Sequence, residues 1–488
     1  MPPPAQTRNQ QLVDYIVATG TRKFPAEVVD AAKRALADFL GVAVGASNDA
    51  PVRPVRATVK RWNSIGNARV FLGGQTTPAL AALANGTMAH AMDYDDTHPG
   101  GAGHPSACCW STALALAEHH GYEERDSMAA FITGYEVMTK LGGGYATGVG
   151  RNLQRRGLHP TSVVGRAGAA AVACALFKLN PQQTAYALGV AATTAGGLVG
   201  SFGTHGKPFH AGKAAMDGIL AAQLASDGFI AATHLYELGE LDKTPRNKEA
   251  HRATLLDVFI QDHEVKPPPL EFDPSWEILS NGFKPFASCR ATQASTQAAR
   301  TLAEKIAGRT IRRVHAKVHP NALITAGKLA PRTPLEGKFS VPFCIALALR
   351  GHQVVASDFT HDKMHESAVM DVVPLVELEA VPGQPPHSAH LDVFLADGEH
   401  LHADTDIVIG HPDNPMSWAD LRVKFEGLSE PVIGVTKTKT LFETAQNFEQ
   451  PGSIRTLLNY WRARSNVRDH FTSWNNLCVA AVSTLHTQ

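Results

Sequence analysis

Apolar residues in the first half of the chain recur with the spacing of helices. Pro25 suits the first turn of a helix, because its fixed φ is already helical. Beyond it, one helical face carries Val29, Ala32, Leu36, Phe39 and Leu40. This periodicity predicts a helix that begins at Pro25.

Five further segments are rich in alanine, poor in β-branched residues and often closed by glycine or asparagine. This pattern is typical of helices with C-terminal stops. The segments are PALAALANGTMAHAM, ACCWSTALALAEHHG, SMAAFITGYEVMTKLGGG, SVVGRAGAAAVACALFKLN and AMDGILAAQLASDG. Because small residues let helices approach closely, we expect an all-helical body packed tightly around its middle helices.

The pattern changes at residues 264–274, EVKPPPLEFDP, where three consecutive prolines cannot continue a helix. Shorter and more β-branched runs follow, including TIRRVHAKVHP and HQVVASDFT. The run HLDVFLADGEHLHADTDIVIG alternates apolar and polar residues around a turn, which predicts a hairpin. Helices are expected at about 290–307 and 340–350. These elements indicate a smaller α/β domain.

After GHPDNP, residues 410–415, the helical pattern returns in SWADLRVKFEGL and GSIRTLLNYWRAR. The predicted fold is therefore mainly α with a smaller α+β domain. Residues 1–268 and 412–488 form a large helical domain, and residues 269–411 form an α/β lid inserted between them.

Charge and composition exclude several classes of protein. The chain has 488 residues, with 45 Lys and Arg against 45 Asp and Glu, so it has no general attraction for nucleic acid or anionic membranes. No apolar run approaches the ~20 residues that span a bilayer. The N-terminus lacks the pattern of a secretory signal, and the six cysteines show no C-x-x-C spacing. We expect a cytoplasmic protein with reduced thiols.

The stretch HAMDYDDTHPGGAGHPS, residues 90–106, gathers three histidines and three aspartates in a chain with 18% charged residues. A metal site, a solvated turn and a proton-transfer site are all compatible with it. The ligand types match none of the short helical metal motifs, although an irregular loop can still bind a metal. Each aspartate taken singly is a common turn or N-cap residue, and His90 has the spacing of a packed helix residue.

Three other segments carry candidate chemistry: RGLHPTSVVG with His159, GTHGKPFHAGKAAMDG with Lys207, and NGFKPFASCR with Lys284. The first two come at predicted helix starts, where free N–H groups and the helix dipole favour anions. Together with Lys213, they indicate a multiply charged carboxylate or phosphate ligand. Lys213 suits a solvated helix face equally well, and Cys289 suits a small buried residue.

Nucleotide-binding and serine-hydrolase motifs are missing. LGGGYATGVG has glycines without a following Lys-Ser/Thr, and no G-x-S-x-G elbow occurs.

Several ordered motifs resemble the MmgE/PrpD family, which includes 2-methylcitrate dehydratase, cis-aconitate decarboxylase and iminodisuccinate epimerase. They cover nearly the whole chain: HAMDYDDTH…GHPS, GLHPTSVVGRAGAAAVACALFKLN, THGKPFHAGKAA, FKPFASCR, EGKFSVPFCIALAL and GHPDNPMSWADLRVKF. The resemblance implies a helical domain with an α/β lid, a homodimer, a site in the cleft between domains, and no metal or organic cofactor.

In members that decarboxylate cis-aconitate, the matching functional positions are Asp93, Thr97, His104, His159 and Lys207. Here His104 follows Thr97 one residue later than in those decarboxylases. Cys289 and Gln293 stand where some of them have histidines, and no tyrosine occurs between Asn321 and Pro334.

These positions predict a cofactor-independent lyase that acts on a di- or tricarboxylate by dehydration or decarboxylation. Histidine suits proton transfer because its pKa, about 6.5, lies near neutrality. An epimerase or isomerase is the alternative, and a non-catalytic carboxylate-binding relative is a third possibility.

The expected roles follow from that chemistry. His104 and His159 form the acid–base pair, Lys207 holds a substrate carboxylate, and Asp93 orients a histidine or fixes the loop. The other expected contacts with the ligand come from Thr97, His210, Lys213, Lys284 and Arg290.

Overall fold

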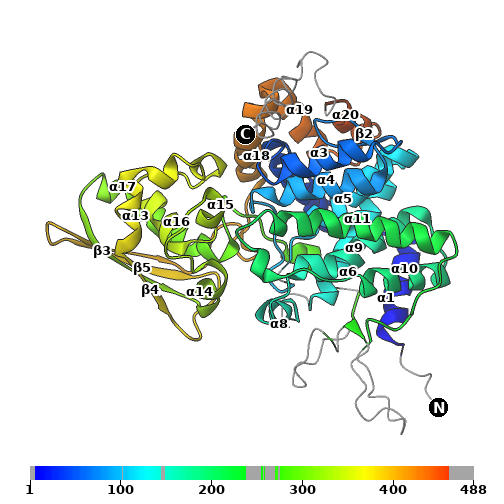
Figure 1. Ribbon diagram of the computed structural model, residues 1–488, viewed down its shortest axis with the longest axis horizontal. Coiled ribbons are helices and arrows are strands. Elements are labelled where there is room, and N and C mark those ends of the chain that lie inside the picture. Colours follow the sequence, from blue (N-terminus) through cyan, green and yellow to red (C-terminus); the bar gives the residue numbers. More distant parts are fainter. Residues whose placement is uncertain are drawn as a thin grey trace, which may run out of the picture.

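The chain folds into a large helical body and a smaller α/β lobe beside it (Figure 1). The computed structural model describes residues 6–101, 103–143, 149–237, 254–255, 258, 270–272 and 275–460. The predicted fold class, mainly α with a smaller α/β part, is confirmed. The predicted boundary at 268/269 lies outside these residues, and the one at 411/412 falls in the loop between β6 and α18.

The helical body contains every Ala-rich segment that the sequence predicted to be helical. Its first part comprises α1 (Arg8–Val17), α2 (Ala26–Gly45), α3 (Val52–Trp62), α4 (Pro78–Ala91), α5 (Pro105–His120), α6 (Glu124–Leu141), α8 (Val149–Arg155), α9 (Pro160–Phe177), α10 (Pro181–Thr193) and α11 (Gly206–Ser226), with two short strands, β1 (Ala68–Arg69) and β2 (Gln75–Thr76). The helix predicted to begin at Pro25 is α2, which begins one residue later, with Pro25 as its N-cap.

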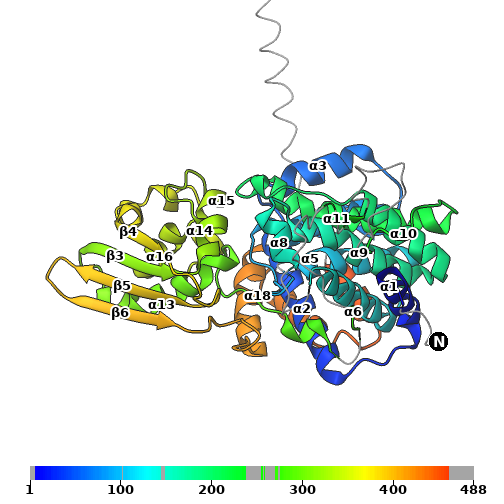
Figure 2. The same ribbon diagram turned by 90° about the horizontal axis from the view of Figure 1, so that it is seen from below.

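Three helices from the C-terminal segment complete this body: α18 (Trp418–Ile433), α19 (Val435–Gln446) and α20 (Ser453–Tyr460). Helix α18 packs against α2, so residues almost 400 positions apart share one core. Figure 2 shows α18 at the junction between the body and the lobe. Among the described helices, α9 is long and apolar enough to cross a membrane, but it is buried as the central helix of the body.

Close backbone contacts set the spacing of α4, α9 and α11. A Cβ atom on Gly212 of α11 would lie 2.1 Å from the Leu83 carbonyl oxygen of α4. A Cβ on Gly218 would lie 2.4 Å from Ala169 Cβ of α9. Only glycine permits such contacts, because any side chain at these positions would overlap the neighbouring helix.

The lobe is built on a four-stranded sheet with the order β4-β3-β5-β6. Strands β3 (Ile311–Val318) and β4 (Val376–Ala380) pair in parallel, and β3, β5 (Ala389–Leu395) and β6 (His400–Thr405) pair antiparallel. The predicted hairpin is β5–β6. The lobe's helices are α13 (Gln293–Ile306), α14 (Pro320–Ala326), α15 (Pro334–Gly337), α16 (Val341–Leu349) and α17 (Ser367–Met370). Helix α13 packs on β5 and β6 and on α16.

One β-branched run, HQVVASDFT, forms no strand. It is a loop with a short 3-10 turn at Ala356–Asp358, and Val354 adopts a positive φ of 58° with its side chain buried. Apolar side chains of this run pack into the core from a turn. Its β-branched composition, which is typical of strands, therefore does not indicate its structure.

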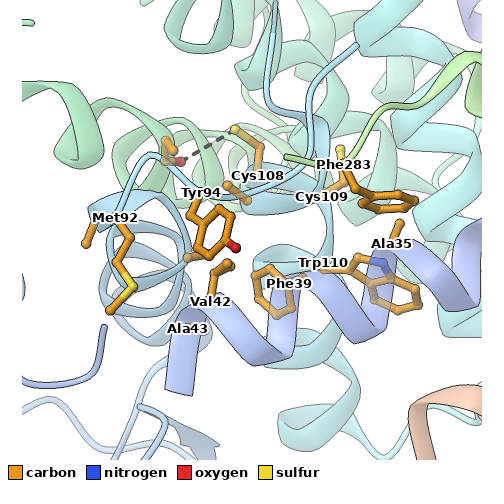
Figure 3. Close-up of a cluster of buried hydrophobic side chains, with 14 of the residues drawn as sticks. Ala35, Phe39, Val42, Ala43, Met92, Tyr94, Cys108, Cys109, Trp110 and Phe283 are labelled. Carbon is orange, nitrogen blue, oxygen red and sulfur yellow. Dashed lines mark hydrogen bonds between the residues drawn. The ribbon is translucent and has the colours of Figure 1, made fainter. Parts of the chain in front are cut away.

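A core cluster lies beneath the acid-rich stretch that follows α4. Tyr94 points toward α2, where Phe39 and Val42 lie, and Cys108 and Trp110 of α5 flank the same region (Figure 3). Tyr94 is buried, and its hydroxyl donates to the Pro285 carbonyl at 2.7 Å. The loop after α4 is therefore anchored both in the helical core and to the segment that leads into the lobe.

Candidate active site

A cavity of about 270 Å³ lies between the helical body and the lobe. The body contributes Asp93, Thr97, His98, Pro99, His104, Gln154, His159, Phe202 and Lys207 to its wall. The lobe and its connecting segments contribute Lys284, Cys289, Arg290, Ala291, His319, Asn321, Ala322, Thr325, Phe339, Pro386, His387 and His411. A larger hollow of about 770 Å³ between α18 and the lobe has none of these histidines in its wall. The acid–base groups therefore converge on the smaller cavity.

Helix starts deliver three of the key side chains. His104 and His159 are the N-caps of α5 and α9, each followed by a proline at the first helical position, and Lys207 lies in the first turn of α11. Proline suits that position because its missing N–H would have no partner there. The N-terminal ends of helices carry positive partial charge, so this arrangement favours an anionic ligand.

Asp93 is held between two ammonium groups. Its Oδ1 atom bonds with Lys207 Nζ and lies 3.1 Å from Lys284 Nζ. Burial alone would raise the pKa of Asp93, but the two lysines outweigh it and hold that pKa well below its usual range. The carboxylate is therefore ionised, and it fixes both ammonium groups at the cavity wall.

His90 connects this cluster to a second carboxylate. Its Nδ1 lies 2.8 Å from Asp95 Oδ2, and its Nε2 lies 3.1 Å from Lys207 Nζ. Burial lowers the pKa of His90 to about 3, with Lys207 acting in the same direction and Asp95 opposing it. This network assigns a neutral ring that donates from Nδ1 to Asp95 and accepts at Nε2 from Lys207.

His104 shares the same carboxylate. Its Nδ1 lies 3.3 Å from Asp95 Oδ2, and its Nε2 lies 4.0 Å from Asp93 Oδ1. Burial lowers the pKa of His104, and Asp95 offsets only part of that effect. A neutral His104 with its proton toward Asp95 has Nε2 available as a base on the cavity side.

His159 is paired with another imidazole. The Nδ1 atoms of His159 and His210 are 3.1 Å apart, and the His159 ring meets Phe202 edge to face with centroids 5.0 Å apart. Burial, followed by Lys207, holds the pKa of His159 well below its usual range. Burial also lowers the pKa of His210, to about 4. Both rings are therefore neutral near pH 7.

The structure brings together Asp93, Thr97, His104, His159, Lys207, Lys284 and Arg290 at one cavity. It does not bring His210 or Lys213 to the wall. His210 lies behind His159, and Lys213 pairs with Asp217 one turn further along α11, where its side chain is 35% exposed. The helix turns Lys213 away from the cavity, so the sequence-based expectation of direct ligand contacts from these two residues needs correction.

The two positions that depart from the decarboxylase pattern have different surroundings. Cys289 lines the cavity. Gln293 is buried, and its amide braces the adjoining loop through Phe286 and Ser288.

Sequence reasoning missed four groups at the cavity or directly behind it. It took His90 for a packing residue and the Asp95 carboxylate for a turn residue, and it did not single out His319 or His411 from the lobe. One signal was available: the chain has five His-Pro dipeptides. Their histidines, all at the cavity wall, are His98, His104, His159, His319 and His411.

Ligand-type atoms of His90, Asp93, Asp95 and His104 lie within 4.8 Å of one another. A divalent cation bound there would face Lys207, which already bonds with both Asp93 and His90, and Lys284, which bonds with Asp93. These ammonium groups would repel a divalent cation and compete with it for Asp93 and His90. The donor set is suited to binding lysine cations.

Comparison with known proteins agrees with this geometry. The MmgE/PrpD N-terminal domain model matches residues 10–241, and the MmgE/PrpD C-terminal domain model matches residues 286–450. These matches and the relatives described below identify the chain as an enzyme of the lyase class. The chain belongs to the MmgE/PrpD family.

Curated relatives resemble the chain over most of its length. Cis-aconitate decarboxylase from Mus musculus is 25% identical over 439 residues, 86% of each chain. The Homo sapiens protein of the same name is 27% identical and covers 76% of this chain and 77% of its own. A cis-aconitate decarboxylase from Aspergillus terreus is 25% identical over 72% of this chain and 74% of its own.

Proposed function

We propose that the protein is a cofactor-independent lyase that removes carbon dioxide or water from a small di- or tricarboxylate. One observation carries this proposal: two neutral imidazoles, His104 and His159, and the Lys207 ammonium line a single cavity. The names of the relatives make decarboxylation of the cis-aconitate type the first candidate. Membership of the MmgE/PrpD family makes dehydration of the 2-methylcitrate type the second.

In a decarboxylation, the bond from carbon to one carboxylate breaks and carbon dioxide leaves. The electron pair stays on the substrate as an enolate-like anion, conjugated with a remaining carboxylate. Lys207 and Lys284 stabilise that developing charge, and an imidazole then donates a proton to carbon. His159 suits this donation if its Nδ1 accepts the His210 proton, because its own proton then sits on Nε2.

A dehydration uses the same groups with one more proton transfer. His104 Nε2, the unprotonated nitrogen of a ring oriented by Asp95, takes the proton from the carbon next to a carboxylate. The leaving hydroxide departs as water after it accepts a proton from His159. Thr97 and Arg290, which also line the cavity, supply a hydroxyl and a guanidinium for contacts with the substrate.

The test is turnover of four candidate acids by the purified protein, followed by NMR: cis-aconitate, 2-methylcitrate, citrate and iminodisuccinate. Loss of carbon dioxide from cis-aconitate or of water from 2-methylcitrate supports the proposal. Deuterium uptake from solvent at Cα without either loss supports the epimerase alternative. If none of the acids reacts, the proposed activity is wrong.

We further propose that the enzyme is a homodimer in the cytoplasm, which family membership and the free cysteines support. The described cysteines, Cys108, Cys109, Cys174, Cys289 and Cys344, form no disulfide with one another. Light scattering that gives a mass of twice 52.2 kDa would support the dimer, and a mass of 52.2 kDa would contradict it.

A further inference from the structure

Three successive backbone carbonyls beside the candidate active site each accept a hydrogen bond from a different buried lysine. Lys338 Nζ donates to the Met92 oxygen at 2.7 Å, and Lys284 Nζ donates to the Asp93 oxygen at 2.6 Å. Lys424 Nζ donates to the Tyr94 oxygen at 2.7 Å. We call residues 92–94 the carbonyl turn.

The three lysines come from separate parts of the fold. Lys284 lies in the segment that enters the lobe, Lys338 directly follows α15 within the lobe, and Lys424 lies on α18 of the helical body. The carbonyl turn itself follows α4, whose C-terminal end carries negative partial charge that attracts cations. The turn is therefore one of the places at which both parts of the body and the lobe contact one another.

Burial of these ammonium groups has a free-energy cost that packing alone does not explain. Lys284 is fully buried, and Lys338 and Lys424 are 6% and 8% exposed. Lys424 has a carboxylate partner, Asp38 Oδ1, at 2.6 Å, and Lys284 has Asp93. Within the described part of the chain, Lys338 makes no ion pair. Apolar side chains of similar volume often give equal or better stability at such positions, so three lysines here indicate a positional role.

The backbone of the carbonyl turn is itself unusual. Asp93 has a positive φ of 53°, a left-handed conformation that is uncommon for residues other than glycine, although Asp adopts it more readily than most. In this conformation the Asp93 carboxylate reaches Lys207, which in turn contacts His90. Such a conformation persists where its surroundings hold it in place, and here three ammonium groups do so.

We propose that Lys338 and Lys424 are positioning residues that hold the carbonyl turn so that Asp93 aligns Lys207 in the cavity. Through Lys338, the docking of the lobe against the body is coupled to that alignment. Neither residue is among the side chains that line the 270 Å³ cavity, so they act through Asp93. This inference rests on the proposed function of the site.

The test uses Lys338→Met in the full-length protein, which removes the ammonium group and nearly preserves the length of the side chain. Arg56→Met is the matched control, because Arg56 donates to two backbone carbonyls, those of Ser47 and Leu72, in another part of the body. The readouts are kcat and KM with cis-aconitate, or with whichever of the four acids reacts, and amide hydrogen exchange over residues 92–97 measured by mass spectrometry.

For Lys338→Met we expect kcat to fall about a hundredfold, KM to change much less, and exchange in residues 92–97 to become faster. Arg56→Met should change neither kcat nor this exchange. A Lys338→Met protein with wild-type kcat and wild-type exchange would overturn the proposal.

A second variant serves if Lys338→Met does not fold. The double substitution Asp38→Asn with Lys424→Met removes a complete ion pair and leaves no uncompensated buried charge, and the same outcomes decide the proposal. If the wild-type protein reacts with none of the acids, the proposed function fails on its own. The exchange comparison then still decides whether the lysines hold the turn, and unchanged exchange contradicts it.

Discussion

The Nδ1 atoms of His159 and His210 lie 3.1 Å apart, so the two rings share a single proton between them. If both Nδ1 atoms carried a proton, the two N–H groups would repel each other. The pair therefore resists a second protonation, in the same direction as the burial that lowers the pKa of both rings. His159 carries its own proton on Nε2 when His210 holds the shared one, so His210, which does not line the cavity, influences the tautomer of His159.

Replacement of His159 should lower kcat more than replacement of His210. His159→Ala should lower kcat at least about a hundredfold, since acid–base groups contribute ~10²–10⁴. His210→Phe keeps His159 but removes its proton partner, so kcat should fall by less while KM stays near its wild-type value. Steady-state kinetics and a thermal melt check both variants. Wild-type kcat in His159→Ala would remove this residue from the mechanism.

Two lysines on the same helix provide a matched comparison. Lys207→Ala should lower kcat/KM at least about a hundredfold, because it removes a cation of the kind whose loss costs ~3 kcal/mol. Lys213→Ala should stay within about twofold of wild type, because its side chain is directed toward Asp217 rather than the cavity. Equal losses in the two variants would contradict the placement of Lys213.

Asp96 predicts a pH dependence of stability. Burial raises its pKa to about 8, whereas an unfolded chain gives about 3.9. The folded state therefore keeps a proton that the unfolded state loses, and this contribution to stability is present below about pH 4 and lost as pH rises through 8. Between pH 5 and 8, the Tm of wild type relative to Asp96→Asn should fall. A constant Tm difference measured by calorimetry would show that Asp96 is already ionised in the folded protein.

Chelators should leave the activity unchanged. Two members of the ligand-type cluster of His90, Asp93, Asp95 and His104 are bonded to lysines: His90 to Lys207, and Asp93 to Lys207 and Lys284. These ammonium groups oppose a bound cation. Turnover should therefore be the same before and after dialysis against EDTA. If activity is lost and then restored by zinc or magnesium, a metal mechanism replaces the one proposed here.

Local sequence patterns predicted most of the fold because helices leave strong local signals. The Ala-rich segments that became α4, α5, α6, α9 and α11 combine propensity with glycine or asparagine stops, and the β5–β6 hairpin shows its alternation directly. The β-branched run HQVVASDFT forms a loop in which the side chain of Val354 is buried, and composition does not reveal what a loop packs against.

The candidate site was predictable only in part, because several of its residues have a role only through distant partners. His90 has the spacing of a packed helix residue, and it is one; its function comes from Asp95 and from Lys207, which is 117 positions away. In the sequence, Lys213 and Lys207 are both lysines near the start of a predicted helix. In the structure, they point in different directions from α11, and only Lys207 lines the cavity. The hydrogen bonds from Lys284, Lys338 and Lys424 to backbone carbonyls leave no sequence pattern. Every residue has a backbone carbonyl, so the identity of the accepting residue carries no signal.

The contact between Gly212 and the backbone of α4 has a consequence for how this enzyme can change. Helix α11 carries Lys207 and α4 carries His90. The separation of the two helices therefore sets the distance between this ammonium group and this imidazole. A single methyl group at position 212 would push α4 and α11 apart and so increase that distance, although position 212 does not line the cavity. Gly212 therefore constrains the site from outside the cavity, and we expect replacement by any larger residue to disturb it.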